Sequence, residues 1–308
     1  MKSREESFER LTGLFNITVT PFTETGELDV KALESAIVRV RDLGYSGLLI
    51  GGTYGEFPTM NTAERAILFR AVMAVVGDAM PVLLCTAHSD PRVVRELTAL
   101  ASELGGVPMV TAPYVSEITD DQIVDFFRAI APSSRTGLMI YNAPGIGITL
   151  APSLIERLAG LDGVVALKQG ELSPTTVDIL AGTVLGRIRV LAASDLVMLG
   201  PIAAGFDGVS STNSCAIPEL VLAVYRALRS GDAALAGRLH RAWYPLRACA
   251  RAFGQPQSTK AAMALRGWAG GHVRAPLLDL GAPERAKIRN ALALLTAEPA
   301  AGSITLVD

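Results

Sequence analysis

Three side chains with chemical potential follow short apolar segments of this sequence. Lys168 ends the apolar run 164–167, and Tyr141 ends another. Thr53 lies in the glycine-rich segment 51–55 after a third. An amine held in a low-dielectric site loses part of its charge and becomes a nucleophile for a ketone. A phenol beside it can carry the protons that imine formation requires. The pattern therefore predicts an imine-forming site for a small carbonyl compound.

Each of these residues also has a purely structural interpretation. Lys168 could simply reach solvent at the end of its strand, and Tyr141 could lie at the core edge with a satisfied hydroxyl. A turn such as 51–55 could bind phosphate, but no G-K-[ST] and no dinucleotide-binding spacing is present. Backbone N–H groups and the Thr53 hydroxyl are better suited to a carboxylate. The imine hypothesis depends on the three residues meeting in space.

Other chemistries find little support. His88, His240 and His272 are scattered and lack clustered carboxylates, so we expect no metal site. No Ser stands in G-x-S-x-G and no cofactor motif follows a strand, so we expect no cofactor. The formal net charge of -2 provides no electrostatic footprint for nucleic acid or an anionic membrane. After these exclusions, we expect a small-molecule substrate as the partner of this protein.

The elements that must position these residues alternate between apolar runs and amphipathic segments. Eight runs are nearly continuous in hydrophobicity, which is typical of parallel strands buried on both faces. They lie at 15–22, 47–52, 82–88, 107–113, 138–144, 164–169, 188–194 and 208–213. Eight β–α repeats with short connections predict an α/β fold, a (β/α)8 TIM barrel whose active site lies at the C-terminal ends of the strands. An open doubly wound sheet remains the alternative.

Helix signals stand between these runs. Start signals are found at Asp29, Asn61, Asp90 and Ser173, the last two followed by Pro. Glycines occupy the positions where helices must end, at residues 44, 77, 105 and 186. This regular punctuation supports the repeated β–α unit.

The strand pattern stops after Gly231. Helices rich in Ala, Leu and Arg are predicted at 232–253, 258–268 and 282–296. The last segment, 297–308, has the composition of a loose tail. We therefore expect a catalytic barrel over residues 1–231 and a C-terminal helical region over residues 232–308, packed against the barrel or a neighbouring subunit.

Targeting signals are not recognisable. The mixed charges of residues 1–10 are not followed by the apolar segment of a secretory signal. No window approaches the roughly 18 apolar residues that span a bilayer. The three cysteines are far apart and lack C-x-x-C spacing, which indicates reduced thiols. A cytoplasmic protein is expected.

Three motifs in order resemble those of the dihydrodipicolinate synthase/N-acetylneuraminate lyase family. The family's G-[TS]-x-G-E loop is similar to Gly52-Thr53-Tyr54-Gly55-Glu56. Its Y-N-x-P motif is similar to Tyr141-Asn142-Ala143-Pro144, and its strand ending in the Schiff-base lysine is similar to Val165-Ala166-Leu167-Lys168. The resemblance covers nearly the whole chain, from Thr20-Pro21-Phe22 to Arg274-x-Pro276-Leu277.

The resemblance implies a role for each of these residues. Lys168 would form the imine with pyruvate or a related small 2-oxo acid, and Tyr141 would donate and accept protons. Thr53 would relay protons to Tyr141, and Thr53 and Tyr54 would hold the carboxylate of the oxo acid. The backbone around Ser210 would complete the pocket. Members of the family are commonly homotetramers built as dimers of dimers, so a homo-oligomer is implied.

The departures from the family pattern concern the second substrate. Ile146 falls where the true synthase carries an Arg that binds the carboxylate of its aldehyde substrate, and an apolar side chain cannot do this. Val115 replaces the second of two adjacent Tyr residues. Tyr54 replaces a Thr, and Gln169 replaces a frequent acidic residue. The bulky Tyr54 and Ile146 predict a less anionic second substrate or leaving fragment.

The leading hypothesis is therefore a Schiff-base-forming lyase, either an aldolase or a dehydratase, that is not a true dihydrodipicolinate synthase. Two alternatives stay open. The chain could be 4-hydroxy-tetrahydrodipicolinate synthase with another residue in place of the missing Arg. It could also be a non-catalytic barrel that retains the scaffold as a sensor or structural subunit.

Overall fold

The eight apolar runs form eight parallel strands that close on themselves. The computed structural model describes residues 2–307. Each strand pairs with the next, and β8 returns to β1. The strands are β1 (Gly13–Thr18), β2 (Gly47–Ile50), β3 (Val82–Cys85), β4 (Val107–Val110), β5 (Leu138–Asn142), β6 (Val164–Gln169), β7 (Arg189–Ala192) and β8 (Gly208–Ser211). This closure confirms the predicted TIM barrel and excludes the open sheet.

Most strands are shorter than the apolar runs that predict them. The run 164–169 coincides with β6, whereas the other seven continue past the ends of their strands. Burial explains the difference: Ala87 and Ala112 are 0% and 5% exposed although they lie beyond β3 and β4. The loops at the C-terminal end of the barrel are therefore partly internal, and apolarity alone overestimates strand length there.

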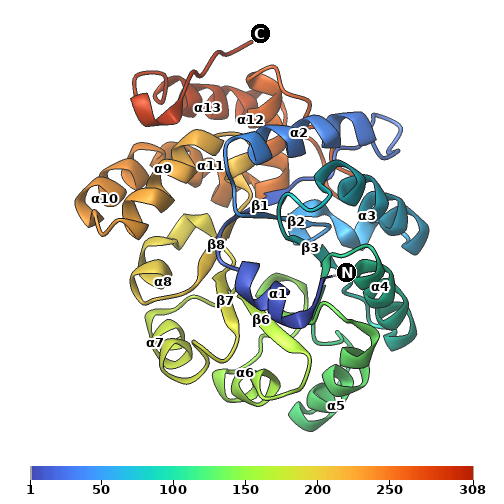
Figure 1. Ribbon diagram of the computed structural model, residues 1–308. Helices are drawn as coiled ribbons and strands as arrows, with labels where there is room; N and C mark the ends of the chain where they lie inside the picture. The colour runs from blue at the N-terminus through green and yellow to red at the C-terminus, as the bar shows by residue number, and fades with distance from the viewer. Residues whose placement is uncertain (1, 308) are drawn as a thin grey trace.

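Helices surround the barrel as the sequence signals predict (Figure 1). They are α2 (Val30–Asp42), α3 (Thr62–Val76), α4 (Pro91–Glu103), α5 (Asp120–Ile130), α6 (Pro152–Ala159), α7 (Pro174–Thr183), α8 (Leu199–Ala203) and α9 (Pro218–Arg229). Asp29, Asn61, Asp90 and Ser173 all accept a hydrogen bond from the first turn of their helix. Asn61 and Glu64 form a reciprocal capping box.

Glycines allow the barrel to close between its first and last strands. Gly13 of β1 pairs with Gly208 of β8. A Cβ atom on Gly208 would lie 2.1 Å from the Gly13 carbonyl oxygen, closer than any real contact. Gly13 itself has φ of 104°, a conformation that favours glycine. The absence of both side chains lets the two backbones approach at this seam.

The N-terminal end of the barrel is covered by α1 (Arg4–Arg10), a helix that the sequence analysis did not predict (Figure 1). Arg4 forms an ion pair with Asp162, which precedes β6, at 2.8 Å. Arg189, at the start of β7, donates a hydrogen bond to the Phe8 carbonyl oxygen at 2.8 Å. Because each partner stands at the beginning of a strand, α1 lies opposite the end where catalysis is expected.

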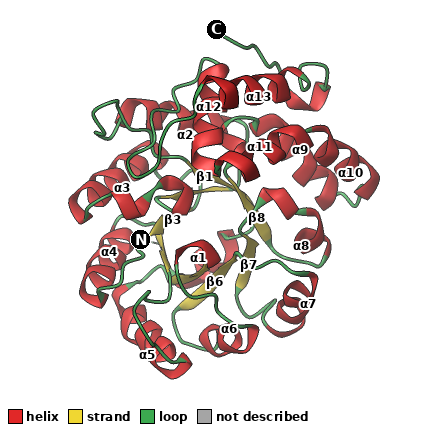
Figure 2. Cartoon of the chain, turned by 180° about the vertical axis from the view of Figure 1, so that it is seen from behind, coloured by secondary structure: helices red, strands yellow, loops and turns green. Residues whose placement is uncertain are grey.

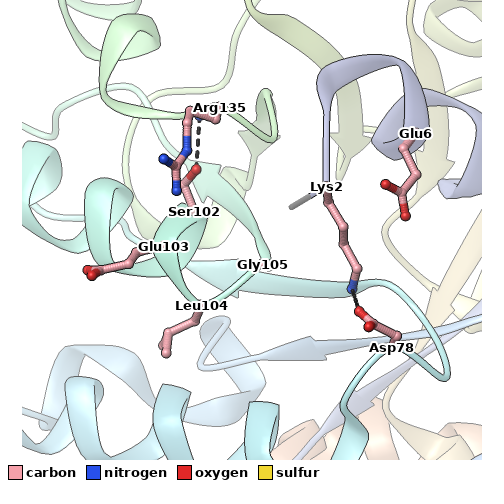
Figure 3. Close-up of a pocket in the computed structure, with 8 residues that line it drawn as sticks. All are labelled: Lys2, Glu6, Asp78, Ser102, Glu103, Leu104, Gly105 and Arg135. Carbon is pink, nitrogen blue, oxygen red and sulfur yellow. Dashed lines mark hydrogen bonds and ion pairs between the residues drawn. The ribbon is translucent and has the colours of Figure 1, made fainter.

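A cavity of about 370 Å³ lies beside α1, as Figure 3 shows. Its wall includes Lys2, which forms an ion pair with Asp78 at 3.3 Å. The Arg135 backbone N–H donates to the Ser102 hydroxyl at 2.9 Å in the same wall. These loops precede strands of the barrel. The cavity therefore belongs to the face of a TIM barrel that contributes stability and not to the face that carries catalytic groups.

Four helices follow the barrel and lie together beside α2 and α9 (Figure 2). They are α10 (Ala233–Ala242), α11 (Tyr244–Phe253), α12 (Gln255–Leu265) and α13 (Ala282–Ala293). The predicted helix 232–253 is thus two helices, which is a correction. Pro245 explains the break between them, because its ring cannot continue an existing helix but fits the first turn of a new one.

The segment 297–307 also differs from the loose tail expected from its composition. Pro299–Ala301 forms a 3-10 turn, and Ala301 is fully buried. The Val307 N–H donates to the Leu265 carbonyl oxygen at 2.9 Å. Asp308 and Met1 lie outside the described residues. Within residues 2–307, every helix falls short of the length and apolar character that crossing a bilayer requires.

Candidate active site

A second cavity, of about 210 Å³, opens at the C-terminal end of the barrel. Its lining residues are Thr53, Tyr54, Tyr141, Ala143, Pro144, Gly145, Lys168, Gly170, Ala193 and Ser194. They come from the ends of β2, β5, β6 and β7 or from the loops that follow. Four of the five residues predicted for the site therefore meet in one cavity, as the imine hypothesis requires.

Lys168 projects into this cavity from β6. Its residue is 3% exposed, and it stands directly beside Tyr141 in the register of β5 and β6. The Lys168 Nζ atom lies 4.3 Å from the centroid of the Tyr141 ring. Burial lowers the pKa of Lys168 to about 7, against a weaker opposing influence of the Cys85 thiol. A large share of this amine is thus neutral and nucleophilic near neutral pH.

Tyr141 and Thr53 form a hydrogen-bonded pair. The Tyr141 Oη and Thr53 Oγ1 atoms are 2.7 Å apart, and the Thr53 N–H donates to the same phenol oxygen at 3.4 Å. Burial raises the pKa of Tyr141 far above its ordinary value, with the bonds from Thr53 acting in the opposite direction. The phenol therefore holds its proton and can deliver it to an oxygen bound near Lys168.

The glycine-rich segment that was predicted to hold a carboxylate forms a 3-10 turn over Thr53–Gly55. Its internal hydrogen bonds are donated by Gly55 and Glu56, which leaves the N–H groups of Thr53 and Tyr54 outside the turn's own bonds. The Tyr54 side chain lines the cavity, and its hydroxyl accepts a hydrogen bond from Gln255 Nε2 at 2.9 Å. Gln255 of α12 thereby holds the Tyr54 side chain in place.

Ser210 stands apart from the other predicted site residues. It lies fully buried in β8, and its hydroxyl donates to the Ala192 carbonyl oxygen at 3.3 Å. Among the described residues it is not part of the cavity wall. The wall on this side is built by Ala193 and Ser194, directly after β7. Their position at the end of a predicted strand was the signal that the sequence analysis did not use.

The departures from the family pattern occupy distinct places. Ile146 is partly buried and packs against the hydrophobic core from the turn Pro144–Ile146. Val115 is 46% exposed on the surface of the chain. Gln169 is fully buried, accepts a hydrogen bond from Asn142 at 3.0 Å and donates to the Glu171 carbonyl oxygen at 2.7 Å. Gln169 thus supports the loop after β5, because Asn142 also bonds both polar groups of the Leu150 backbone.

A polar cluster behind Ser194 was not predicted. Asp195 is 1% exposed and accepts hydrogen bonds from the side chains of Ser211 and Asn213. Burial raises the pKa of Asp195, and these hydrogen bonds act in the opposite direction. The cluster joins the ends of β7 and β8 and so fixes the loop that carries Ser194 into the cavity wall.

Relatives of this chain match it over most of its length. A protein of Synechococcus elongatus named 4-hydroxy-tetrahydrodipicolinate synthase is 34% identical over 278 residues, covering 89% of this chain and 92% of the relative. A protein of Streptomyces coelicolor named 4-hydroxy-tetrahydrodipicolinate synthase 1 is 37% identical over 268 residues, covering 84% of this chain and 86% of the relative.

Solved structures agree with these sequence matches. The prophage protein YagE of E. coli K12, described as a member of the dihydrodipicolinic acid synthase family in complex with pyruvate, superposes with a TM-score of 0.86 at 26% identity, over 93% of this chain and 99% of YagE. The 4-hydroxy-tetrahydrodipicolinate synthase of Methylacidiphilum fumariolicum SolV gives a TM-score of 0.86 at 26% identity, over 92% and 95% of the two chains. Residues 10–295 match the model of the dihydrodipicolinate synthetase family. The chain belongs to this family of pyruvate-using class I lyases.

Proposed function

We propose that this protein is a class I lyase in which Lys168 forms an imine with pyruvate or a closely related 2-oxo acid. The observation that carries the proposal is the geometry of three side chains. A buried amine with a pKa of about 7 lies beside the Tyr141 ring, and the Tyr141 hydroxyl is paired with Thr53. The complex of the related YagE with pyruvate supports the choice of substrate.

The chain's own groups account for each step of imine formation. Lys168 Nζ adds to the C2 carbonyl carbon of the oxo acid. Tyr141 passes a proton to the C2 oxygen and takes up the one that the nitrogen loses, which forms a carbinolamine. The C2 hydroxyl then leaves as water with a proton from Tyr141, and Thr53 can return a proton to the phenol. The N–H groups of Thr53 and Tyr54 would hold the substrate carboxylate meanwhile.

The iminium acts as the electron sink that lyase chemistry requires. Its positive nitrogen accepts the electron pair of a bond to C3, so that either a C3 proton leaves or the C3–C4 bond breaks, and an enamine results. In the reverse direction the enamine C3 adds to an aldehyde carbon and the aldehyde oxygen takes up a proton. Water finally hydrolyses the imine and restores the Lys168 amine.

The cavity wall favours an uncharged second substrate. Among residues 2–307, Lys168 is the one charged side chain in this wall, and its other members are neutral. The names of the relatives support a second candidate, the synthase reaction with its carboxylate-bearing aldehyde. Rates of condensation of pyruvate with a panel of aldehydes distinguish these two candidate reactions. Faster condensation with aspartate semialdehyde than with uncharged aldehydes of similar size would overturn our choice.

Borohydride trapping tests the core of the proposal. Incubation with pyruvate and borohydride should add one reduced pyruvyl group, and peptide mapping should place it on Lys168. Lys168→Ala should abolish the adduct, whereas Lys31→Ala, at an exposed position of α2, should leave it unchanged. If neither pyruvate nor any other small 2-oxo acid labels Lys168, the proposal fails, and a non-catalytic barrel becomes the better explanation.

We also propose that the protein is a homo-oligomer. Tyr114 and Val115 are 40% and 46% exposed and adjacent in the loop after β4, so they offer apolar surface to a neighbouring subunit. This loop contacts the one after β5, because a Cβ atom on Gly147 would lie 2.9 Å from the Tyr114 Cβ atom. Sedimentation velocity should show a dimer or tetramer at micromolar concentration, and a monomer there would contradict this part of the proposal.

A further inference from the structure

Glu56 and Lys260 form a buried ion pair behind the active-site turn. Their side chains are 0% and 2% exposed, and Glu56 Oε1 lies 2.5 Å from Lys260 Nζ. The other carboxylate oxygen accepts the Arg274 backbone N–H at 2.8 Å. Lys260 also donates to the His272 carbonyl oxygen at 2.6 Å. The pair thus joins the loop after β2 to two parts of the C-terminal region, α12 and the segment that follows it.

The backbone turns Glu56 away from the cavity. Glu56 follows the turn Thr53–Gly55 in a left-handed conformation, with φ of 60° and ψ of 33°. Neither Glu56 nor Lys260 lines the cavity that contains Lys168. The pair therefore does not exchange protons with the substrate. Taking two charges out of water carries a large cost in free energy, which makes a buried pair an inefficient way to gain stability.

A second contact from α12 reaches the same turn. Gln255 begins α12 and donates to the Tyr54 hydroxyl at 2.9 Å, while Lys260 lies five residues later in the helix. A third bond joins the turn to the loop after β1, where the Thr20 hydroxyl donates to the Gly55 carbonyl oxygen at 2.7 Å. The turn is consequently fixed at three successive residues, two of them by one helix.

Close packing holds the C-terminal segment against the barrel loops. A Cβ atom on Gly271 would lie 2.7 Å from the Phe22 nitrogen, and one on Gly270 would lie 2.9 Å from the Lys260 carbonyl oxygen. The Arg274 guanidinium forms an ion pair with Glu64 at 2.7 Å. The segment that follows α12 and bonds to Lys260 and Glu56 is therefore firmly held. A displacement of α12 would in turn displace Glu56.

We propose that Glu56, Lys260 and Gln255 are positioning residues that hold the Thr53–Tyr54 turn in the geometry that receives the carboxylate of the 2-oxo acid. This inference rests on the proposed function and adds to it that the C-terminal helical region is part of the substrate-binding apparatus. We call these three positioning residues the clamp. The amine proposed to form the imine stands on β6 and is not part of it. Loss of the clamp should therefore weaken recognition of the carboxylate more than the reactivity of the amine.

The test compares two ketones, pyruvate and hydroxyacetone, which lacks the carboxylate. For Gln255→Leu and Glu56→Gln, the pyruvate concentration that half-saturates borohydride trapping should rise by about tenfold, because small misplacements of binding groups have effects of this size or larger. Trapping of hydroxyacetone should change less than twofold. Gln255→Leu removes a neutral contact, so it keeps the test valid if the Glu56 variant does not fold.

An apolar double variant separates positioning from stability. Glu56→Leu with Lys260→Met removes both buried charges, and such replacements often restore or increase stability. We expect it to recover stability in urea relative to Glu56→Gln while its half-saturation for pyruvate stays high. Recovery of both quantities would show a purely structural pair and overturn the proposal, as would unchanged half-saturation in Gln255→Leu.

A distant variant serves as the matched control. Asp207→Asn weakens a partly buried ion pair with Arg189, 2.8 Å apart, at the opposite end of the barrel. It should lower stability without changing the half-saturation for pyruvate. A tenfold rise of the half-saturating pyruvate concentration in Asp207→Asn would mean that any loss of stability loosens the site. That result would contradict a specific role of the clamp. Failure of the wild-type chain to trap pyruvate on Lys168 would instead refute the proposed function itself.

Discussion

Two buried lysines show how the surroundings decide the chemistry of a side chain. Lys168 and Lys260 are both 3% exposed. Lys260 is paired with Glu56, whereas no carboxylate within residues 2–307 lies in ion-pairing distance of Lys168. An unpaired amine avoids the cost of burial by losing its proton, and a paired one can keep its charge. The same residue type is therefore available as a nucleophile in one place and as a partner of a buried carboxylate in the other.

The pKa of Lys168 predicts how its reactivity depends on pH. With a pKa of about 7, the neutral fraction rises about tenfold between pH 6 and pH 8 and then levels off. An amine with the ordinary lysine pKa near 10.4 would instead keep gaining about tenfold per unit through pH 9. Labelling with a small acylating reagent at each pH, followed by peptide mapping, measures the curve. Continued growth above pH 8 would contradict the assigned environment.

At the scale of elements, the strands bring together residues that are far apart in the chain. Tyr141 and Lys168 are neighbours because β5 and β6 pair in register, with Tyr141 opposite Lys168 and Asn142 opposite Gln169. One step of slippage would place the phenol against another residue and turn side chains to the wrong face. Closure of the barrel prevents such slippage, because every strand has two partners.

The glycine seam between β1 and β8 should therefore be sensitive to substitution. In Gly208→Ala the new methyl group meets the Gly13 backbone at 2.1 Å, so the strands must separate. We expect a loss of about 1–3 kcal/mol of unfolding free energy, as for other strained core insertions, or a failure to fold. Urea denaturation followed by circular dichroism measures the loss.

Gly182→Ala is the matched control for this prediction. Gly182 lies in α7, and nothing stands within 4 Å of the position that its Cβ atom would occupy. Alanine is a better helix former, so this change should raise the unfolding free energy by roughly 0.5–1 kcal/mol. If both substitutions had the same small effect, the seam would not limit closure of the barrel.

At the scale of the whole molecule, the two ends of the barrel carry different tasks. The C-terminal end holds the cavity with Lys168, and α12 reaches this end from the C-terminal region. The other end is covered by α1, whose Phe8 ring lies 4.2 Å from the Arg189 guanidinium carbon. This division agrees with the general separation of catalysis and stability in TIM barrels.

Phe8→Ala tests this division. It should lower the unfolding free energy by roughly 1–3 kcal/mol, less than for a fully buried Phe, and leave trapping of pyruvate unchanged. Glu9→Ala, exposed on the same helix, should remain within about 0.5 kcal/mol of the wild type. Weakened trapping in Phe8→Ala with unchanged stability would show that α1 acts on the site.

Much of this organisation could be predicted from the sequence because it is encoded locally. Continuous apolar runs marked buried parallel strands, and Asp29 and Asn61 marked helix starts, since both signals depend on neighbours within a few residues. The order of the runs then predicted the barrel. The type and position of Lys168 and Tyr141 predicted that they would adjoin each other at the ends of neighbouring strands, and the register of β5 and β6 confirms this contact.

The remaining features were decided by tertiary structure, because burial and long-range contacts have no local pattern. The lowered pKa of Lys168 depends on the atoms that exclude water around it. Gln255 contacts Tyr54 across 201 positions of the chain, and Lys260 contacts Glu56 across 204. Only packing could place Ser210 outside the cavity wall. The sequence determined which groups were available, and the folded chain determined which of them meet and in what charge state.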